Sequence, residues 1–190
     1  MGEIADTLRS AALATLVSLL LVGAPSAQLV NENLLVPLPH GYKIDFKAER
    51  NNMVMNEMVP VNETVGKWTE MVTVQILHGL KAAPEKFKTL LQDRWAAACP
   101  GATGAQVTSG VENGYPVLLW LLDCPRNPAT GKPEITWFKA IAGNDSFYLV
   151  QKAFKFEPTE TQVEHWMQYL KTVAVCDTRV PARACPQAGK

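Results

Sequence analysis

The sequence predicts an α+β fold, in which a mainly antiparallel sheet of about six or seven strands is flanked by two principal helices. Several segments alternate apolar and polar residues, as strands with one solvated face do. Turn residues join neighbouring strand segments into hairpins. Apart from the N-terminal segment, helical spacing begins only at Pro84 and at Thr159. Strands joined by hairpins, with few helices, are typical of an antiparallel sheet.

Three strands come before the first helix. Residues 42–50 read "YKIDFKAER", in which Tyr42 and Ile44 point to one side and the charged residues to the other. A turn leads into "MVMNEMVPV", a weaker strand whose Pro60 suits a sheet edge, because proline has no N–H to donate. Residues 68–77, "WTEMVTVQIL", alternate again.

The first helix begins with Pro84 and Glu85, which suit the first turn of a helix. Phe87 and Leu91 follow at helical spacing, and Pro100-Gly101 ends the segment. We therefore expect a helix that lays one apolar side on the sheet.

Two hairpins follow this helix. The first, "AQVTSGVENGYPVLLWLL", turns at Asn113-Gly114, a pair that favours a type I′ turn. Its second arm is apolar without alternation over residues 117–122, so we expect that strand to be covered on both faces. The second hairpin joins "ITWFKAIA" to "SFYLVQKAFKF" through residues 143–145.

The last helix opens with a capping box formed by Thr159 and Gln162. Trp166 and Leu170 belong to its apolar stripe. A short "VAVC" then leads into the tail of the chain.

The N-terminal segment has the composition of a secretory signal. Residues 11–24 are apolar and uncharged, too short for the about 20 residues of a membrane-spanning helix but suited to the core of a signal peptide. Small residues near Ala27 provide a cleavage site. An uncleaved N-terminal anchor is the main alternative. We expect a signal peptide over 1–27, a single domain over 28–176 and a disulfide-stapled tail over 177–190.

Four cysteines fit an exported, periplasmic or extracellular protein with two disulfides. Cys99, Cys124, Cys176 and Cys185 allow three pairings, among which sequence alone does not choose. Locality favours Cys176 with Cys185, which leaves Cys99 with Cys124. The spacing lacks the clustered ligands of a zinc site and the C-x-x-C of a redox site, so we expect no metal and no cofactor.

The order of elements resembles the PsbP/Mog1-like fold. The stretches that carry the resemblance are "PHGYKIDF", "WTEMVTVQIL", "NGYPVLLWLL" and "QYLKTVAV", and it covers residues 39–176. It implies an antiparallel sheet flanked by helices, and a non-enzymatic binding or assembly role in a protein that, in bacteria, is often exported. No functional residue is carried over, since no site motif is shared.

The net charge of the chain and the absence of a catalytic motif limit the classes of function that we expect. Lysine plus arginine and aspartate plus glutamate number 18 each, so no net positive field attracts nucleic acid. We expect an exported, non-catalytic binding or envelope-accessory domain whose partner is an envelope protein or a small ligand. Trp68, Met53, Met55 and Met58 are the candidate surface residues, because Trp68 follows a polar stretch and clustered methionines form adaptable surfaces.

Two alternatives remain. An exported hydrolase with a dispersed site would bring His40 or His78 to a nucleophile and a carboxylate. A Cu(I)-handling protein would bring three methionine sulfurs together, which needs a bulge, because Met53 and Met55 share a face of a regular strand and Met58 points away.

Overall fold

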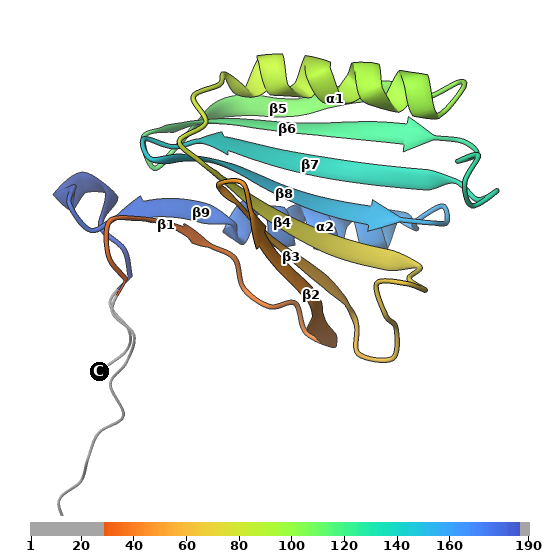
Figure 1. Ribbon diagram of the computed structural model, residues 1–190, viewed down its shortest axis with the longest axis horizontal. Coiled ribbons are helices and arrows are strands. Elements are labelled where there is room, and N and C mark those ends of the chain that lie inside the picture. The colour runs from red at the N-terminus through yellow and green to blue at the C-terminus, as the bar shows by residue number, and fades with distance from the viewer. Residues whose placement is uncertain (1–28, 187–190) are drawn as a thin grey trace, which may run out of the picture.

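A computed structural model describes residues 29–186 (Figure 1). Residues 1–28 and 187–190 lie outside the described part, so the predicted signal peptide lies there too. No helix within residues 29–186 has the length and apolar character needed to cross a membrane.

The predicted α+β fold is confirmed. Seven strands form one antiparallel sheet in the order β2-β3-β4-β8-β7-β6-β5, and β1 and β9 pair separately as a two-stranded sheet. The large sheet comprises β2 (Tyr42–Arg50), β3 (Met53–Pro60), β4 (Glu70–His78), β5 (Thr103–Glu112), β6 (Tyr115–Cys124), β7 (Glu134–Ala142) and β8 (Ser146–Phe154). The remaining elements are β1 (Glu32–Leu35), α1 (Pro84–Ala98), α2 (Glu160–Thr172), β9 (Ala174–Asp177) and a 3-10 turn (Pro181–Arg183).

The two helices lie on opposite faces of the sheet, which gives three layers (Figure 1). Below α1, the side chains of Trp120, Phe138 and Leu149 form one apolar cluster. Below α2, Trp137 and Val150 belong to a second, larger cluster that also contains residues of β9. Alternation along each strand produces the two cores, because successive side chains point to opposite faces.

The turns form where the sequence predicts them. Asn113 and Gly114 have φ values of 47° and 76°, the positive values of a type I′ hairpin turn. Asn51 and Asn52, at 51° and 60°, connect β2 to β3 in the same way. Asparagine tolerates this backbone conformation better than most residues. The turn residues themselves therefore determine where both hairpins turn.

Helix α2 is fixed at both ends. Thr159 and Gln162 form the predicted capping box at its start. At its end, the Lys139 ammonium donates to the carbonyl oxygens of Leu170 and Val173 at 3.0 and 2.8 Å. A cation there stabilises the negative end of the helix dipole.

Both predicted disulfides are present, Cys99–Cys124 and Cys176–Cys185. The first joins the end of α1 to the end of β6, and the second closes the tail after β9. All four cysteines are thus in disulfides, and none of them carries a free thiol.

Two expectations about strands are wrong. We expected β3 to suit a sheet edge, but it lies between β2 and β4. Pro60 is the last residue of β3, so its missing N–H marks the end of the strand rather than the edge of the sheet. The lead-in before β2 also contains β1, which pairs with β9 over only four residues.

Candidate functional site

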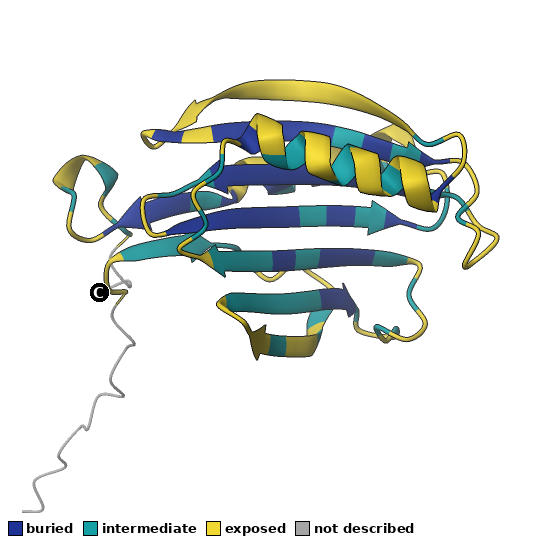
Figure 2. Cartoon of the chain, turned by 45° about the horizontal axis from the view of Figure 1, so that its top comes forward, coloured by how far each residue is buried: buried dark blue, intermediate teal, exposed yellow. Residues whose placement is uncertain are grey.

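Helix α1 covers only one half of its face of the sheet. Figure 2 shows it in front of β6, and its contacts are with β6 and β7 and, through Phe87, with Phe147 at the start of β8. The rest of β8, together with β4, β3 and β2, carries no helix on that side. We call the side chains on this bare half the uncovered face. Its members are Phe46, Ala48, Arg50, Met53, Met55, Glu57, Thr73, Gln75, Gln151 and Ala153.

The strand register places these side chains together. Phe46 pairs with Glu57, Glu57 with Thr73, and Thr73 with Gln151, so one row of side chains crosses four strands. The same row continues through Phe138 to Trp120, which are only 1% and 0% exposed under α1. Phe46 at the other end is 39% exposed. One continuous row is thus core at one end and surface at the other.

A second row adds polar contacts between strands. The Gln151 side-chain amide donates to the Gln75 side-chain oxygen at 3.4 Å, and the Gln75 amide lies 3.6 Å from the Met55 sulfur. These contacts hold long side chains in place while leaving them partly exposed. Glu57 is the one carboxylate on the uncovered face, and partial burial raises its pKa.

The methionines divide between two sides of the sheet. Met53 and Met55 lie on the uncovered face, as strand alternation predicts. Met58 is 4% exposed and belongs to the core cluster below α2. The three sulfur atoms therefore do not converge, which disfavours the copper hypothesis.

Trp68 lies just before β4 and is partly exposed. The Lys155 ammonium lies 3.7 Å from the centre of its ring, a cation–π contact. Burial lowers the pKa of Lys155. Trp68 thus already has an intramolecular partner, which its position after a polar stretch did not indicate.

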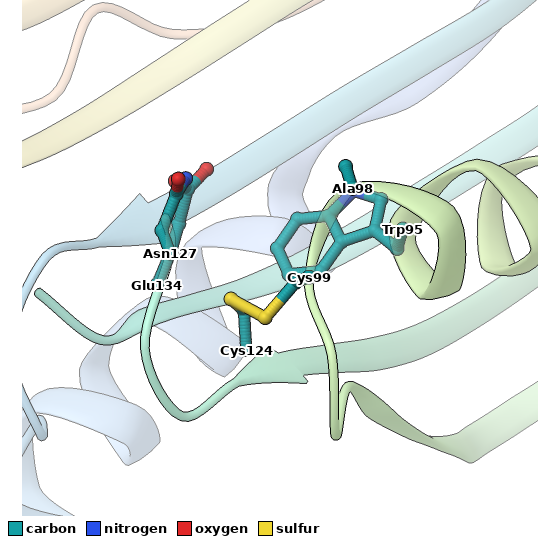
Figure 3. A pocket seen from close by; sticks show the side chains of 6 residues that line it. All are labelled: Trp95, Ala98, Cys99, Cys124, Asn127 and Glu134. Atoms are coloured by element: carbon teal, nitrogen blue, oxygen red, sulfur yellow. A yellow bond between two sulfur atoms is a disulfide. The ribbon is translucent and has the colours of Figure 1, made fainter. Parts of the chain in front are cut away.

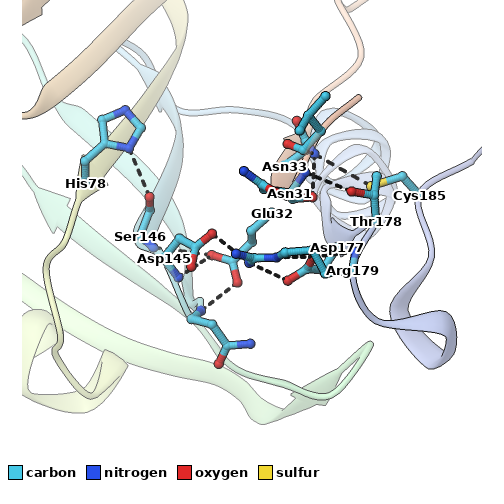
Figure 4. Close-up of polar contacts among 12 residues, drawn as sticks. Asn31, Glu32, Asn33, His78, Asp145, Ser146, Asp177, Thr178, Arg179 and Cys185 are labelled. Carbon is cyan, nitrogen blue, oxygen red and sulfur yellow. Dashed lines mark hydrogen bonds and ion pairs between the residues drawn. The ribbon is translucent and has the colours of Figure 1, made fainter. Parts of the chain in front are cut away.

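The histidine geometry gives little support to a hydrolase. His78 Nδ1 lies 3.1 Å from the Ser146 hydroxyl, as Figure 4 shows. Ser146 is only 3% exposed, so its oxygen is poorly accessible to a substrate. Its backbone N–H donates to Glu32, at 3.3 Å. The pair holds the end of β4 to the β7–β8 turn.

The same region anchors the N-terminal strand. The Glu32 carboxylate accepts hydrogen bonds from the backbone N–H groups of Asn144, Asp145 and Ser146 at 2.6, 2.9 and 3.3 Å, and from the Tyr148 hydroxyl at 2.9 Å. Burial and the hydrogen bond to Glu32 raise the pKa of Tyr148. These contacts explain how a four-residue strand stays attached.

A small cavity of about 140 Å³ lies where α1 ends, beside the Cys99–Cys124 disulfide (Figure 3). Trp95 forms one wall, and the Asn127 amide donates to the Glu134 carboxylate at 2.7 Å on another. Its volume is below the about 300 Å³ at which ligand pockets begin. It suits ordered water or one side chain of a partner better than a metabolite.

The sequence did not point to Phe46, Gln75 or Gln151. Alternation shows that each of these residues lies on a face, but not which face a helix covers. They are exposed because α1 lies mainly over β6 and β7.

No protein-family model and no curated protein matches the chain. Among solved structures, the chain is similar to the Ran-binding protein Mog1p of Saccharomyces cerevisiae and to a mutant of protein Mog1. Each shares 10% identity, with a TM-score of 0.42, over 74% of this chain and 85% of the other. The weak Mog1-like resemblance of the sequence thus recurs in the structure. It concerns the fold alone.

Proposed function

We propose that this protein is an exported, non-catalytic binding domain that acts through a protein partner, and that the partner docks on the uncovered face. The observation that carries the proposal is the row from Phe46 to Gln151, which is partly exposed although its continuation forms the core. A sheet face with nothing over it exposes apolar area that a partner would bury.

The chemistry of the uncovered face favours a protein over a charged ligand. Phenylalanine and methionine supply apolar contact area, and threonine and glutamine supply hydrogen-bonding groups. The centres of protein interfaces are enriched in aromatic residues and methionine and are poor in charge. Glu57 is the one acid in this set, and partial burial raises its pKa.

Export is supported by two features. The N-terminal segment has the composition of a signal peptide, and both cysteine pairs form disulfides, which persist in oxidising compartments. An envelope protein is therefore the expected class of partner.

Site-specific crosslinking in an exporting host tests the proposal. A photoreactive residue is placed at Met55, and in a matched variant at Lys171, an exposed position on α2. The expected result is a discrete protein adduct at Met55 that is absent at Lys171. Equal adducts at both positions, or none at Met55, would contradict a docking role for the uncovered face.

A further inference from the structure

The two edge strands of the large sheet, β2 and β5, differ in how well they are protected against pairing with another chain. The β2 edge carries charged residues at five of its nine positions and a bulge near Asp45. The β5 edge is ten residues long and exposed along its whole length, as the unbroken yellow strand in Figure 2 shows. It contains no proline, and its one charged residue, Glu112, is paired with Lys139 at 2.6 Å.

Because β5 is the last strand of the sheet, the backbone N–H and C=O groups on its outer side pair with no neighbouring strand in the described part of the chain. Proteins normally block such edges with charge, proline or a short length. β5 has only a bulge at Val107, where the register with β6 shifts between Gln106 and Thr108. An extended chain can form hydrogen bonds with such an edge as an additional strand.

A groove runs beside the first half of this edge. It has a volume of about 330 Å³ and lies between α1 and the start of β5. Gly104 lets the helix come close, because a Cβ there would lie 2.8 Å from the Gln92 side chain. Its lining residues include Asp93, Trp95 and Ala96 of α1.

A strand added outside β5 would direct every second side chain toward this groove. Asp93 is exposed and, among residues 29–186, has no ion-pair partner within 4.0 Å. It is also the only charged residue among those that line the groove. An occupant with a lysine or arginine on the helix side would therefore complement the groove in charge.

We propose that an extended segment of a partner protein adds to the sheet along β5, with a basic side chain beside Asp93. A second copy of this chain fits less well. Two-fold pairing over the whole of β5 would bring both Val107 bulges together at the symmetry axis, where the ladder is interrupted. A peptide is not tied to a symmetry axis, so it can pair with β5 on both sides of the bulge, including the half beside the groove. The inference does not depend on the uncovered face, which lies on the same side of the sheet but toward its opposite edge, over β2, β3 and β4.

Selection of displayed random peptides of about twelve residues against the full protein, recovered from an exporting host, tests this inference. The test variant is Val107→Lys with Val111→Lys, at positions 49% and 70% exposed, and the matched control is Val61→Lys, which is 61% exposed in a loop. We expect selected peptides to bind the test variant at least about tenfold more weakly, because charge on an edge opposes strand addition, and the control about equally. Asp93→Asn should weaken only those peptides that carry lysine or arginine.

Amide hydrogen exchange of β5 completes the test, since a paired strand slows exchange of its outward amides. Peptides that bind both lysine variants equally, or that leave β5 exchange unchanged, would overturn the inference. So would a wild-type dimer that the test variant converts to a monomer, since the occupant would then be a second copy. Met55→Asp should not alter peptide binding, which separates this result from the outcome for the uncovered face.

Discussion

Replacing Lys152 with methionine is expected to change how the stability of the protein depends on pH. Lys152 is fully buried, and its ammonium donates to Glu70 at 2.6 Å and to the Tyr42 hydroxyl at 2.7 Å. It also lies 3.7 Å from the centre of the Trp166 ring. Burial lowers its pKa from 10.5 to about 8, and Glu70 opposes the shift only in part.

The direction of the effect follows from which state holds the proton. Between pH 8 and 10.5, folded Lys152 releases its proton while the unfolded chain keeps it. Because the unfolded state then binds more protons, the free energy of unfolding rises with pH through this window. Each pKa unit corresponds to about 1.4 kcal/mol, so the whole window is worth about 3 kcal/mol.

Urea denaturation of the oxidised protein measures this effect. Between about pH 7.5 and 9.5, the free energy of unfolding of the wild type should rise by about 2 kcal/mol relative to Lys152→Met. Measurements stay below pH 10 because the raised pKa of Tyr42 lowers stability above it. Lys171→Met, an exposed change, should leave the slope intact. A constant difference between wild type and Lys152→Met would show that Glu70 and Trp166 keep Lys152 charged, contrary to a lowered pKa.

Two further predictions concern the covalent and polar anchors of the fold. Replacing Cys99 and Cys124 with serine should lower the free energy of unfolding by about 3–4 kcal/mol, against about 2–3 kcal/mol for Cys176 and Cys185, because the closed loops span 25 and 9 residues; denaturant titration of both double variants checks the order, and the reverse order would contradict it. Glu32→Gln should destabilise the protein by about 1–3 kcal/mol, because three backbone N–H groups lose a charged acceptor. Thermal unfolding measures this loss, and an unchanged midpoint would show that the turn does not need the carboxylate.

Much of the fold could be predicted because local signals determine it. The Asn113-Gly114 turn, the Thr159 capping box and Pro84 at the start of α1 each act within a few residues of the chain. Locality also favours the pairing of Cys176 with Cys185, nine residues apart, which leaves Cys99 for Cys124. These features need no knowledge of how the layers pack.

The rest depends on contacts between distant residues. β1 was missed because its four residues are held by β9 and by the β7–β8 turn, more than 100 positions away in the sequence. Pro60 was assigned to a sheet edge because a proline at the end of an inner strand has the same local pattern. The exposure of Phe46 and Gln151 depends on where α1 lies, which no single segment determines.

Docking of a partner on the uncovered face is best tested by measuring the affinity of the crosslinked partner for variants of that face. Calorimetry with the purified partner would compare wild type, Phe46→Asp, Met55→Asp and the control Lys171→Asp. We expect at least about tenfold weaker binding for the two face variants, as for residues at the centre of an interface, with folding retained and the control unchanged. Equal affinities for all four proteins would contradict this expectation and would place the partner elsewhere on the molecule.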